Sequence, residues 1–161
     1  MICVDEKPIA LHADLRPASS ATPRQEARRN NEYERRGTAS VFCAVEPKAG
    51  RHFTFATPDC SGFEFSQVAV TLAVAYPKAE TIHLAMDNLN IHRRKTLVDD
   101  FGAKMAGEVW DRFTVHYTPA HASRLNQPEI EIGFFSRQRL GHRRIPDFKT
   151  LAKKRKPGTG E

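Results

Sequence analysis

The stretch Thr-Ile-His-Leu-Ala-Met-Asp-Asn-Leu-Asn-Ile-His, residues 81–92, decides the fold. Ile82, Leu84 and Met86 alternate with other residues, a period that predicts a strand over 81–86 with one buried face. Asp87 follows at once and stands at the carboxyl end of this strand. In open α/β sheets, ligands bind beyond the carboxyl ends of the strands. The stretch therefore predicts a sheet with an acidic group at its ligand-binding edge.

A second aspartate stands in the same relation to a strand at the beginning of the chain. Residues 1–4 are typical of a short buried strand, and Asp5 follows Val4 on the face opposite to Ile2. If the two strands are parallel neighbours, Asp5 and Asp87 can share Mg²⁺ or Mn²⁺, which offsets their mutual repulsion. The alternative is that both are ordinary strand-end or turn residues, because Asp-Asn is common in turns.

A third carboxylate, Glu129, opens a helix predicted over 126–140. Asn126 lies three residues before it, which is the capping-box spacing, so Glu129 could be a helix cap and not a ligand. His92 and His121 flank the acidic motifs. With Asn88, His92 could orient a water or a phosphate oxygen, although lone histidines more often have no such role.

The other elements follow from hydrophobic spacing and turn residues. These predict a hairpin of strands over 38–46 and 52–57, helices over 61–75 and 93–110, a strand over 113–117, and a last helix from Pro146. Residues 12–37 are polar and Arg-rich and are predicted to form a long basic loop. The order predicts an α/β three-layer domain over 1–150, with a mixed five-stranded sheet flanked by helices. Residues 151–161 are predicted to form a basic, flexible tail.

Charge and composition point to a polyanionic partner. The net charge is +6, and residues 133–157 hold nine Lys or Arg against the single acid Asp147, so this block is +8 and the remainder −2. A solvated tail is the alternative for residues 153–156. Tyr33 and its neighbours offer a second patch for phosphates and bases, unless those arginines are merely solvated. The DNA-binding candidates are Arg35, Arg36, Arg137, Arg143 and Arg144.

The cysteines and the apolar runs argue against two other classes of protein. Three cysteines without a Cys-x-x-Cys pair predict reduced thiols and a cytoplasmic protein. The longest apolar stretch, residues 68–76, is too short to span a bilayer. We therefore expect no membrane partner and no small-molecule substrate.

These motifs together resemble the DDE transposases of bacterial insertion sequences, in the group related to mariner elements. Six pieces occur in the family's order: Cys-Val-Asp-Glu-Lys-Pro (3–8), Glu-Tyr-Glu-Arg-Arg-Gly-Thr (32–38), Asp-Asn-Leu-Asn-Ile-His (87–92), His-Tyr-Thr-Pro-Ala-His-Ala-Ser (116–123), Leu-Asn-Gln-Pro-Glu-Ile-Glu (125–131) and Arg-Arg-Ile-Pro-Asp (143–147).

The resemblance implies a ribonuclease-H-like fold with Asp5, Asp87 and Glu129 as the catalytic, metal-binding triad. It implies two Mg²⁺ or Mn²⁺ ions, cleavage of DNA at the element ends, and strand transfer into target DNA. It also implies DNA as the partner, a homodimer as one compatible assembly, and a cytoplasmic, nucleoid-associated location.

Departures from the family leave a second hypothesis open. Relatives carry a helix-turn-helix region before the catalytic domain, so we expect this chain to be the C-terminal part of a longer protein or a separate fragment. Arg124 stands where relatives typically have tryptophan, and Pro128 replaces a smaller or apolar residue beside Glu129. The alternative function is that of an inactive, truncated transposase remnant that binds DNA non-specifically. A host ribonuclease or resolvase is disfavoured by the motifs at 33–38 and 125–129.

Overall fold

The computed structural model describes residues 1–26, 28, 30–119, 128–134, 137, 140–141 and 143–153, and the side chains of Glu129, Glu131 and Phe134 are not among the parts described. A five-stranded sheet forms the middle layer. Its strands are β1 (Ile2–Asp14), β2 (Tyr33–Glu46), β3 (Arg51–Thr57), β4 (Ile82–Met86) and β5 (Phe113–Tyr117), in the order β3-β2-β1-β4-β5. The pairs β1–β2 and β2–β3 are antiparallel, whereas β1–β4 and β4–β5 are parallel. The predicted mixed sheet is confirmed.

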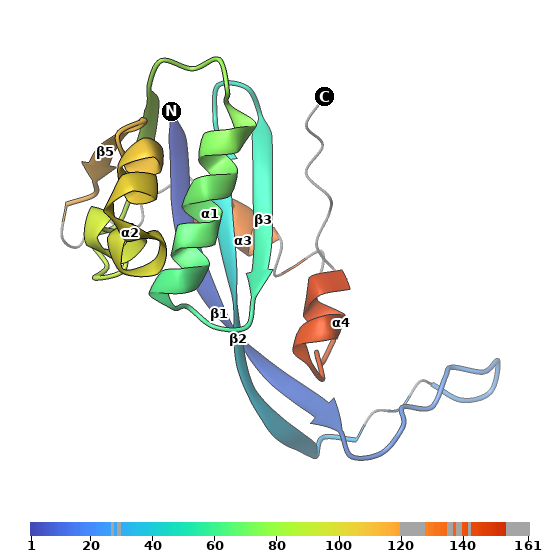
Figure 1. Ribbon diagram of the computed structural model, residues 1–161. Coiled ribbons are helices and arrows are strands. Elements are labelled where there is room, and N and C mark those ends of the chain that lie inside the picture. Colours follow the sequence, from blue (N-terminus) through green and yellow to red (C-terminus); the bar gives the residue numbers. More distant parts are fainter. Residues whose placement is uncertain are drawn as a thin grey trace.

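Helices cover both faces of this sheet, as predicted (Figure 1). Helices α1 (Gly62–Ala75) and α2 (Arg94–Trp110) lie on one face. Helices α3 (Pro128–Phe134) and α4 (Phe148–Lys153) pack against the other. The last helix begins at Phe148 and not at Pro146, because the Asp147 side chain caps it by accepting a hydrogen bond from the Thr150 backbone N–H.

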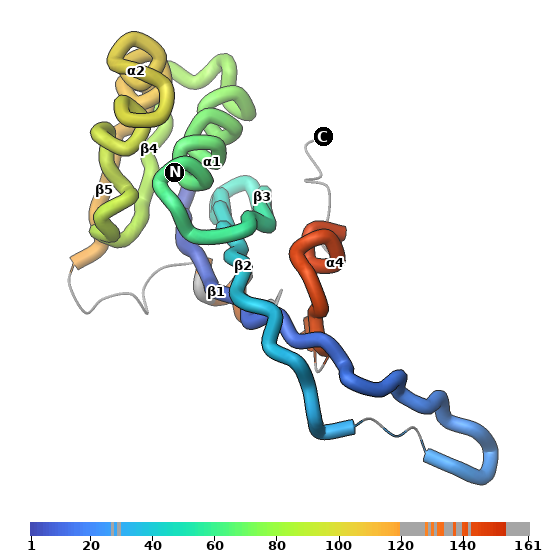
Figure 2. The backbone as a smooth tube through the Cα atoms, turned by 60° about the horizontal axis from the view of Figure 1, so that its bottom comes forward, coloured from blue at the N-terminus to red at the C-terminus, as the bar shows by residue number. Residues whose placement is uncertain are grey.

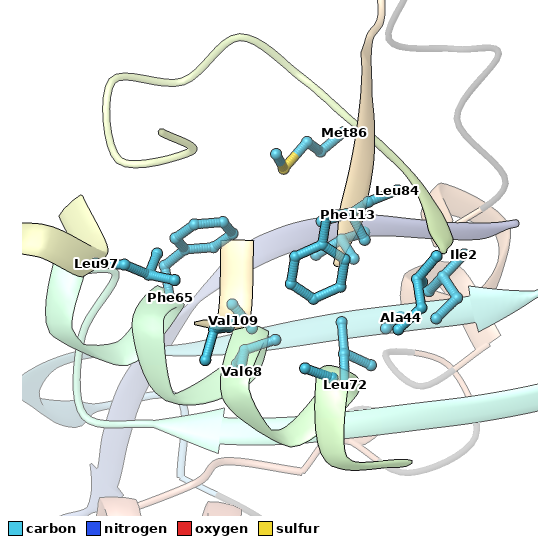
Figure 3. Close-up of a cluster of buried hydrophobic side chains, with 14 of the residues drawn as sticks. Ile2, Ala44, Phe65, Val68, Leu72, Leu84, Met86, Leu97, Val109 and Phe113 are labelled. Atoms are coloured by element: carbon cyan, nitrogen blue, oxygen red, sulfur yellow. The ribbon is translucent and has the colours of Figure 1, made fainter. Parts of the chain in front are cut away.

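Strand alternation builds the larger core between the sheet and the first two helices (Figure 3). Ile2 and Val4 of β1 face α1 and α2, and Leu84 does the same from β4. Helix α1 supplies Phe65, Val68 and Leu72, at the steps of three and four that the sequence predicts. Side chains of this kind each contribute about 1.5–3 kcal/mol when fully buried. They fix the position of β1 beside β4.

A smaller core lies on the opposite face. It joins Ile9 and Leu11 of β1 to Ile132 of α3 and Leu151 of α4. Residues 151–153 therefore end a helix, and the tail predicted over 151–161 is wrong at its start; residues 154–161 lie outside the described residues. This core holds α3 against β1 and β2.

The long basic loop predicted over 12–37 is wrong at both ends. Strand β1 continues to Asp14 and β2 begins at Tyr33, so the two strands leave the body as a paired arm (Figure 2). We call residues 10–38 the arm. Strand pairing, with one register shift between Ala10 and His12, forms the backbone hydrogen bonds of the arm as far as the pair Asp14↔Tyr33. An isolated bridge between Ser19 and Arg28 lies in the connection beyond this pair. Most of its side chains are exposed, so no apolar alternation marks it in the sequence.

Among the described residues, no helix is long and apolar enough to cross a membrane.

Candidate active site

The strand that contains Asp5 and the strand that Asp87 follows are parallel neighbours, which meets the condition set out from the sequence. The register pairs Ile2 with Leu84 and Cys3 with Ala85, and the same register continued by two residues leads to Asp5 and Asp87. Neighbouring strands lie about 4.8 Å apart. Asp87 follows the end of β4, but Asp5 lies within β1 and does not end it, because β1 continues into the arm.

A hollow of about 330 Å³ adjoins Asp5 under α3. It is lined by Asp5, Glu6, Lys7, Ile132 and Gly133. The Asp5 carboxylate also accepts a hydrogen bond from the Glu6 backbone N–H at 2.9 Å. Strand alternation places the side chains of Asp5 and Lys7 on the α3 face of β1, so a carboxylate and an ammonium border this hollow, whereas the Glu6 side chain faces His92 on the other side of the sheet.

Glu129 belongs to the helix above this hollow. It precedes Ile132 and Gly133 by three and four residues in α3, so its Cα lies on the helix face that carries them. The side chain of Glu129 is outside the described parts, and its meeting with the two aspartates stays a prediction. Asn126 and His121 also lie outside the described residues, and Asn88 is exposed.

His92 turns back over Asp87, the arrangement considered from the sequence. Its Nδ1 lies 2.8 Å from Asp87 Oδ1 and 3.1 Å from the Asp87 carbonyl oxygen. Its Nε2 lies 3.4 Å from Glu6 Oε2. The ring is fully buried and contacts Phe65, with 4.7 Å between ring centroids.

These acids perturb the titration of their neighbours. Burial by itself lowers the pKa of His92, but its contacts with Glu6 and Asp87 outweigh burial and raise the pKa above its usual value. Burial raises the pKa of Cys60 to about 11, and the charges of Glu6, Asp59 and Asp87 add to this effect. The shift of His92 thus reflects the neighbouring carboxylates, whereas the shift of Cys60 is due first to burial and then to nearby negative charge.

Sequence reasoning missed Glu6 as a site residue. A signal was present, because strand alternation places Glu6 on the same face as Ile2 and Val4, where an acid is buried and needs a partner. Its partner, His92, lies far along the chain, and only the fold brings the two together.

The arginine candidates occupy different environments. Arg35 and Arg36 are exposed on the arm, and Arg36 donates to the Glu34 carboxylate. Arg137 and Arg143 are exposed near the smaller core. Arg144 is half-buried instead and ties the segment 143–153 to the arm, where the pairing of β1 with β2 ends.

Comparisons with known proteins agree with this fold. The family model for the DDE superfamily endonuclease matches residues 1–152. Two solved structures of the Mos1 mariner transposase share the fold, one a paired-end complex with the left transposon end and the other a paired-end complex with Mn. Their TM-scores are 0.60 and 0.58, at 17% and 16% sequence identity.

Each match covers 94% of this chain and 45% of the solved chain, so the chain spans less than half the length of those proteins. No curated protein matches the chain by sequence. Because the family model covers nearly all of the sequence, this chain belongs to the DDE superfamily of endonucleases.

Proposed function

We propose that this chain is the catalytic domain of an insertion-sequence transposase and performs metal-dependent DNA cleavage and strand transfer. The observation that carries the proposal is the parallel pairing of β1 with β4, since β1 contains Asp5 and Asp87 follows β4, beside the hollow under the helix that bears Glu129. The Mos1 structures are described as complexes with a transposon end and with Mn, which supports DNA as the partner and Mg²⁺ or Mn²⁺ as the ion here.

The donor atoms at this edge suit a hard divalent cation. Carboxylate oxygens are the ligands that Mg²⁺ and Mn²⁺ prefer. Among the described residues, the contacts of the Asp87 carboxylate all fall on Oδ1, so Oδ2 faces no protein partner. Asp5, Asp87 and Glu129 would hold the ions, two in number. When bound, such ions activate the attacking oxygen and stabilise the leaving oxygen of an in-line displacement.

The chain's own residues would position the DNA. In cleavage, a water oxygen bonds to phosphorus and the bond to the 3′ oxygen breaks, which leaves a 3′-hydroxyl at the element end. In strand transfer, the oxygen of that hydroxyl bonds to a phosphorus of the target DNA, and the bond from this phosphorus to the target's 3′ oxygen breaks, which leaves a 3′-hydroxyl on the target. Arg35 on the arm, with Arg137 and Arg143 near the smaller core, offers the positive charge that phosphates need. We expect the protein to act on the nucleoid in the cytoplasm, and a homodimer would bring two element ends together.

The test is nicking of supercoiled plasmid DNA by the purified chain with Mg²⁺ or Mn²⁺. Asp87→Asn keeps the shape of the side chain but removes its charge, so we expect nicking to be abolished. The matched control is Asp99→Asn, an exposed acid of α2 paired only with Lys95 at the surface among the described residues. Its nicking should equal that of the wild type.

Two results would speak against catalysis. Nicking that persists in pure Asp87→Asn protein would refute the proposed role of this carboxylate. Salt-sensitive, sequence-blind DNA binding without cleavage in any divalent ion would favour the inactive remnant instead.

A further inference from the structure

A buried imidazole bridges two carboxylates from different strands at this site. His92 Nδ1 lies 2.8 Å from Asp87 Oδ1, and Nε2, on the other edge of the ring, lies 3.4 Å from Glu6 Oε2. Glu6 Oε2 and His92 Nε2 are buried and make no hydrogen bond within the described part of the chain, so the ion-pair contact between them is the interaction that the structure gives each atom. Each is therefore the other's available partner.

The position of this ring is fixed on every side that the structure describes. His92 is 0% exposed and packs against the Phe65 ring. Its backbone N–H donates to the Leu89 carbonyl at 3.0 Å, and its own carbonyl accepts from the Tyr117 hydroxyl at 2.7 Å. The imidazole is thus held before any ligand arrives, as preorganisation of a site requires.

The contacts also distinguish the two oxygens of Asp87. Oδ1 faces His92 Nδ1 and accepts from the Leu89 backbone N–H at 3.2 Å. No described residue engages Oδ2, and the side chain is 43% exposed. One oxygen is therefore restrained by the protein while the other is open to solvent and to an ion.

A different interpretation would make Glu6, Asp87 and His92 the ligands of one ion, since their ligand atoms lie within 4.8 Å of one another. An imidazole gives a single ring nitrogen to an ion. Here the two nitrogens face different carboxylates across the ring. This arrangement suits a bridge better than a chelate.

We propose that His92, supported by Glu6, is a positioning residue that holds the Asp87 carboxylate with Oδ2 directed to the metal. The proposal rests on the proposed function, because it gives Asp87 the role of a metal ligand. Groups that orient metal ligands typically affect metal affinity by about 10–100-fold when removed.

The first test is Mn²⁺ binding to the 161-residue chain, followed by the loss of the free-ion EPR signal. His92→Asn places an amide near the position of Nδ1 and keeps the contact with Asp87, so its affinity should stay within about threefold of wild type. His92→Gln places its amide near Nε2 and loses that contact, so its affinity should fall about tenfold. Thermal midpoints by circular dichroism check that both variants fold equally well. His116→Asn, an exposed histidine of β5, is the matched control.

A second pair of variants tests whether Glu6 supports His92 or binds the metal ion itself. Glu6→Ala removes the partner of Nε2 and should weaken Mn²⁺ binding by about threefold, whereas Glu6→Gln retains a hydrogen-bonding group and should restore it. If Glu6 were itself a ligand, Glu6→Gln would bind as weakly as Glu6→Ala, and the proposal would be wrong.

Equal affinity of the two His92 variants would also overturn the proposal. That result, with Mn²⁺ still bound by the wild type, leaves the proposed function standing. Failure of the wild type to bind Mn²⁺ would overturn both.

Discussion

Arg144 is the residue whose replacement should loosen the arm without unfolding the body. Its guanidinium lies 2.6 Å from the Asp14 carboxylate and donates to the carbonyls of Asn31 and Glu32, each at 2.9 Å. It also lies over the ring of Tyr33, 4.9 Å from the centroid. These partners belong to both strands of the arm at the outer end of their pairing, so Arg144→Ala removes a clamp across the two strands.

The size of the effect follows from these contacts. Hydrogen bonds that involve a charged group contribute roughly 1.5–3 kcal/mol each in favourable cases, and a cation–π contact adds about 0.5–1 kcal/mol. The side chains of Arg144 and Asp14 are 16% and 32% exposed, so water compensates for part of the loss. We expect a net cost of about 2 kcal/mol for opening the arm, which corresponds to roughly 30-fold faster local exchange.

Amide hydrogen exchange read by mass spectrometry measures this cost directly. Exchange should accelerate in Arg144→Ala at the pairs Ala13↔Glu34 and Asp14↔Tyr33, while β4 and α1 keep their protection. Arg143→Ala is the matched control, because Arg143 is exposed and makes no side-chain contact that the structure describes. Unchanged exchange at these pairs would mean that strand pairing alone holds the arm, and the reasoning would fail.

Three further predictions concern stability and thiol chemistry. The pKa of Cys60 is raised to about 11, so this thiol should react slowly with iodoacetamide at pH 8. Glu6→Gln should speed the reaction, because it removes a negative charge that raises this pKa. Peptide mass spectrometry measures both rates. Burial, followed by the hydrogen bond to Glu46, raises the pKa of Tyr76 to about 12, above the ordinary value of about 10. The stabilisation that this raised pKa gives the folded state should therefore be complete below pH 10 and lost as the pH rises from 10 to 12. Urea titrations over this pH range measure the free energy of unfolding, and Tyr76→Phe should abolish its dependence on pH in this range. Gly102 interrupts α2 with φ at 79°, a conformation that strains a residue with a Cβ atom. Gly102→Ala should therefore lower the free energy of unfolding by about 1 kcal/mol or more and lower Tm by about 3 °C in calorimetry. An unchanged Tm would contradict this reasoning.

The body of the domain could be predicted because its elements bury one face each. Ile82, Leu84 and Met86 alternate along β4, and Phe65, Val68 and Leu72 recur along α1, so burial leaves a readable period in the sequence. The parallel pairing of β1 with β4 was only a condition of the sequence argument, because the order of strands along a chain does not fix which strands are neighbours in the sheet.

The arm could not be predicted for the complementary reason. Residues such as Arg35 and Glu34 are exposed, and the strand there is stabilised by backbone pairing that any side chain permits. A polar, Arg-rich segment therefore looked like a loop. The Glu6–His92 contact was missed because it joins residues distant in sequence, and propensity carries no information about such pairs.

The continuity of β1 has a mechanical consequence. Asp5 and Asp14 are on one uninterrupted strand, and nine residues of strand span roughly 30 Å. Tension or twisting imposed on β1 at Asp14 is transmitted to Asp5 through the covalent backbone and through the hydrogen bonds that pair β1 with β2. The register shift between Ala10 and His12 is a natural pivot, since a bulged strand bends there more readily than in regular pairing. Docking of a macromolecule on the outer part of the arm would therefore strain the part of β1 that contains Asp5.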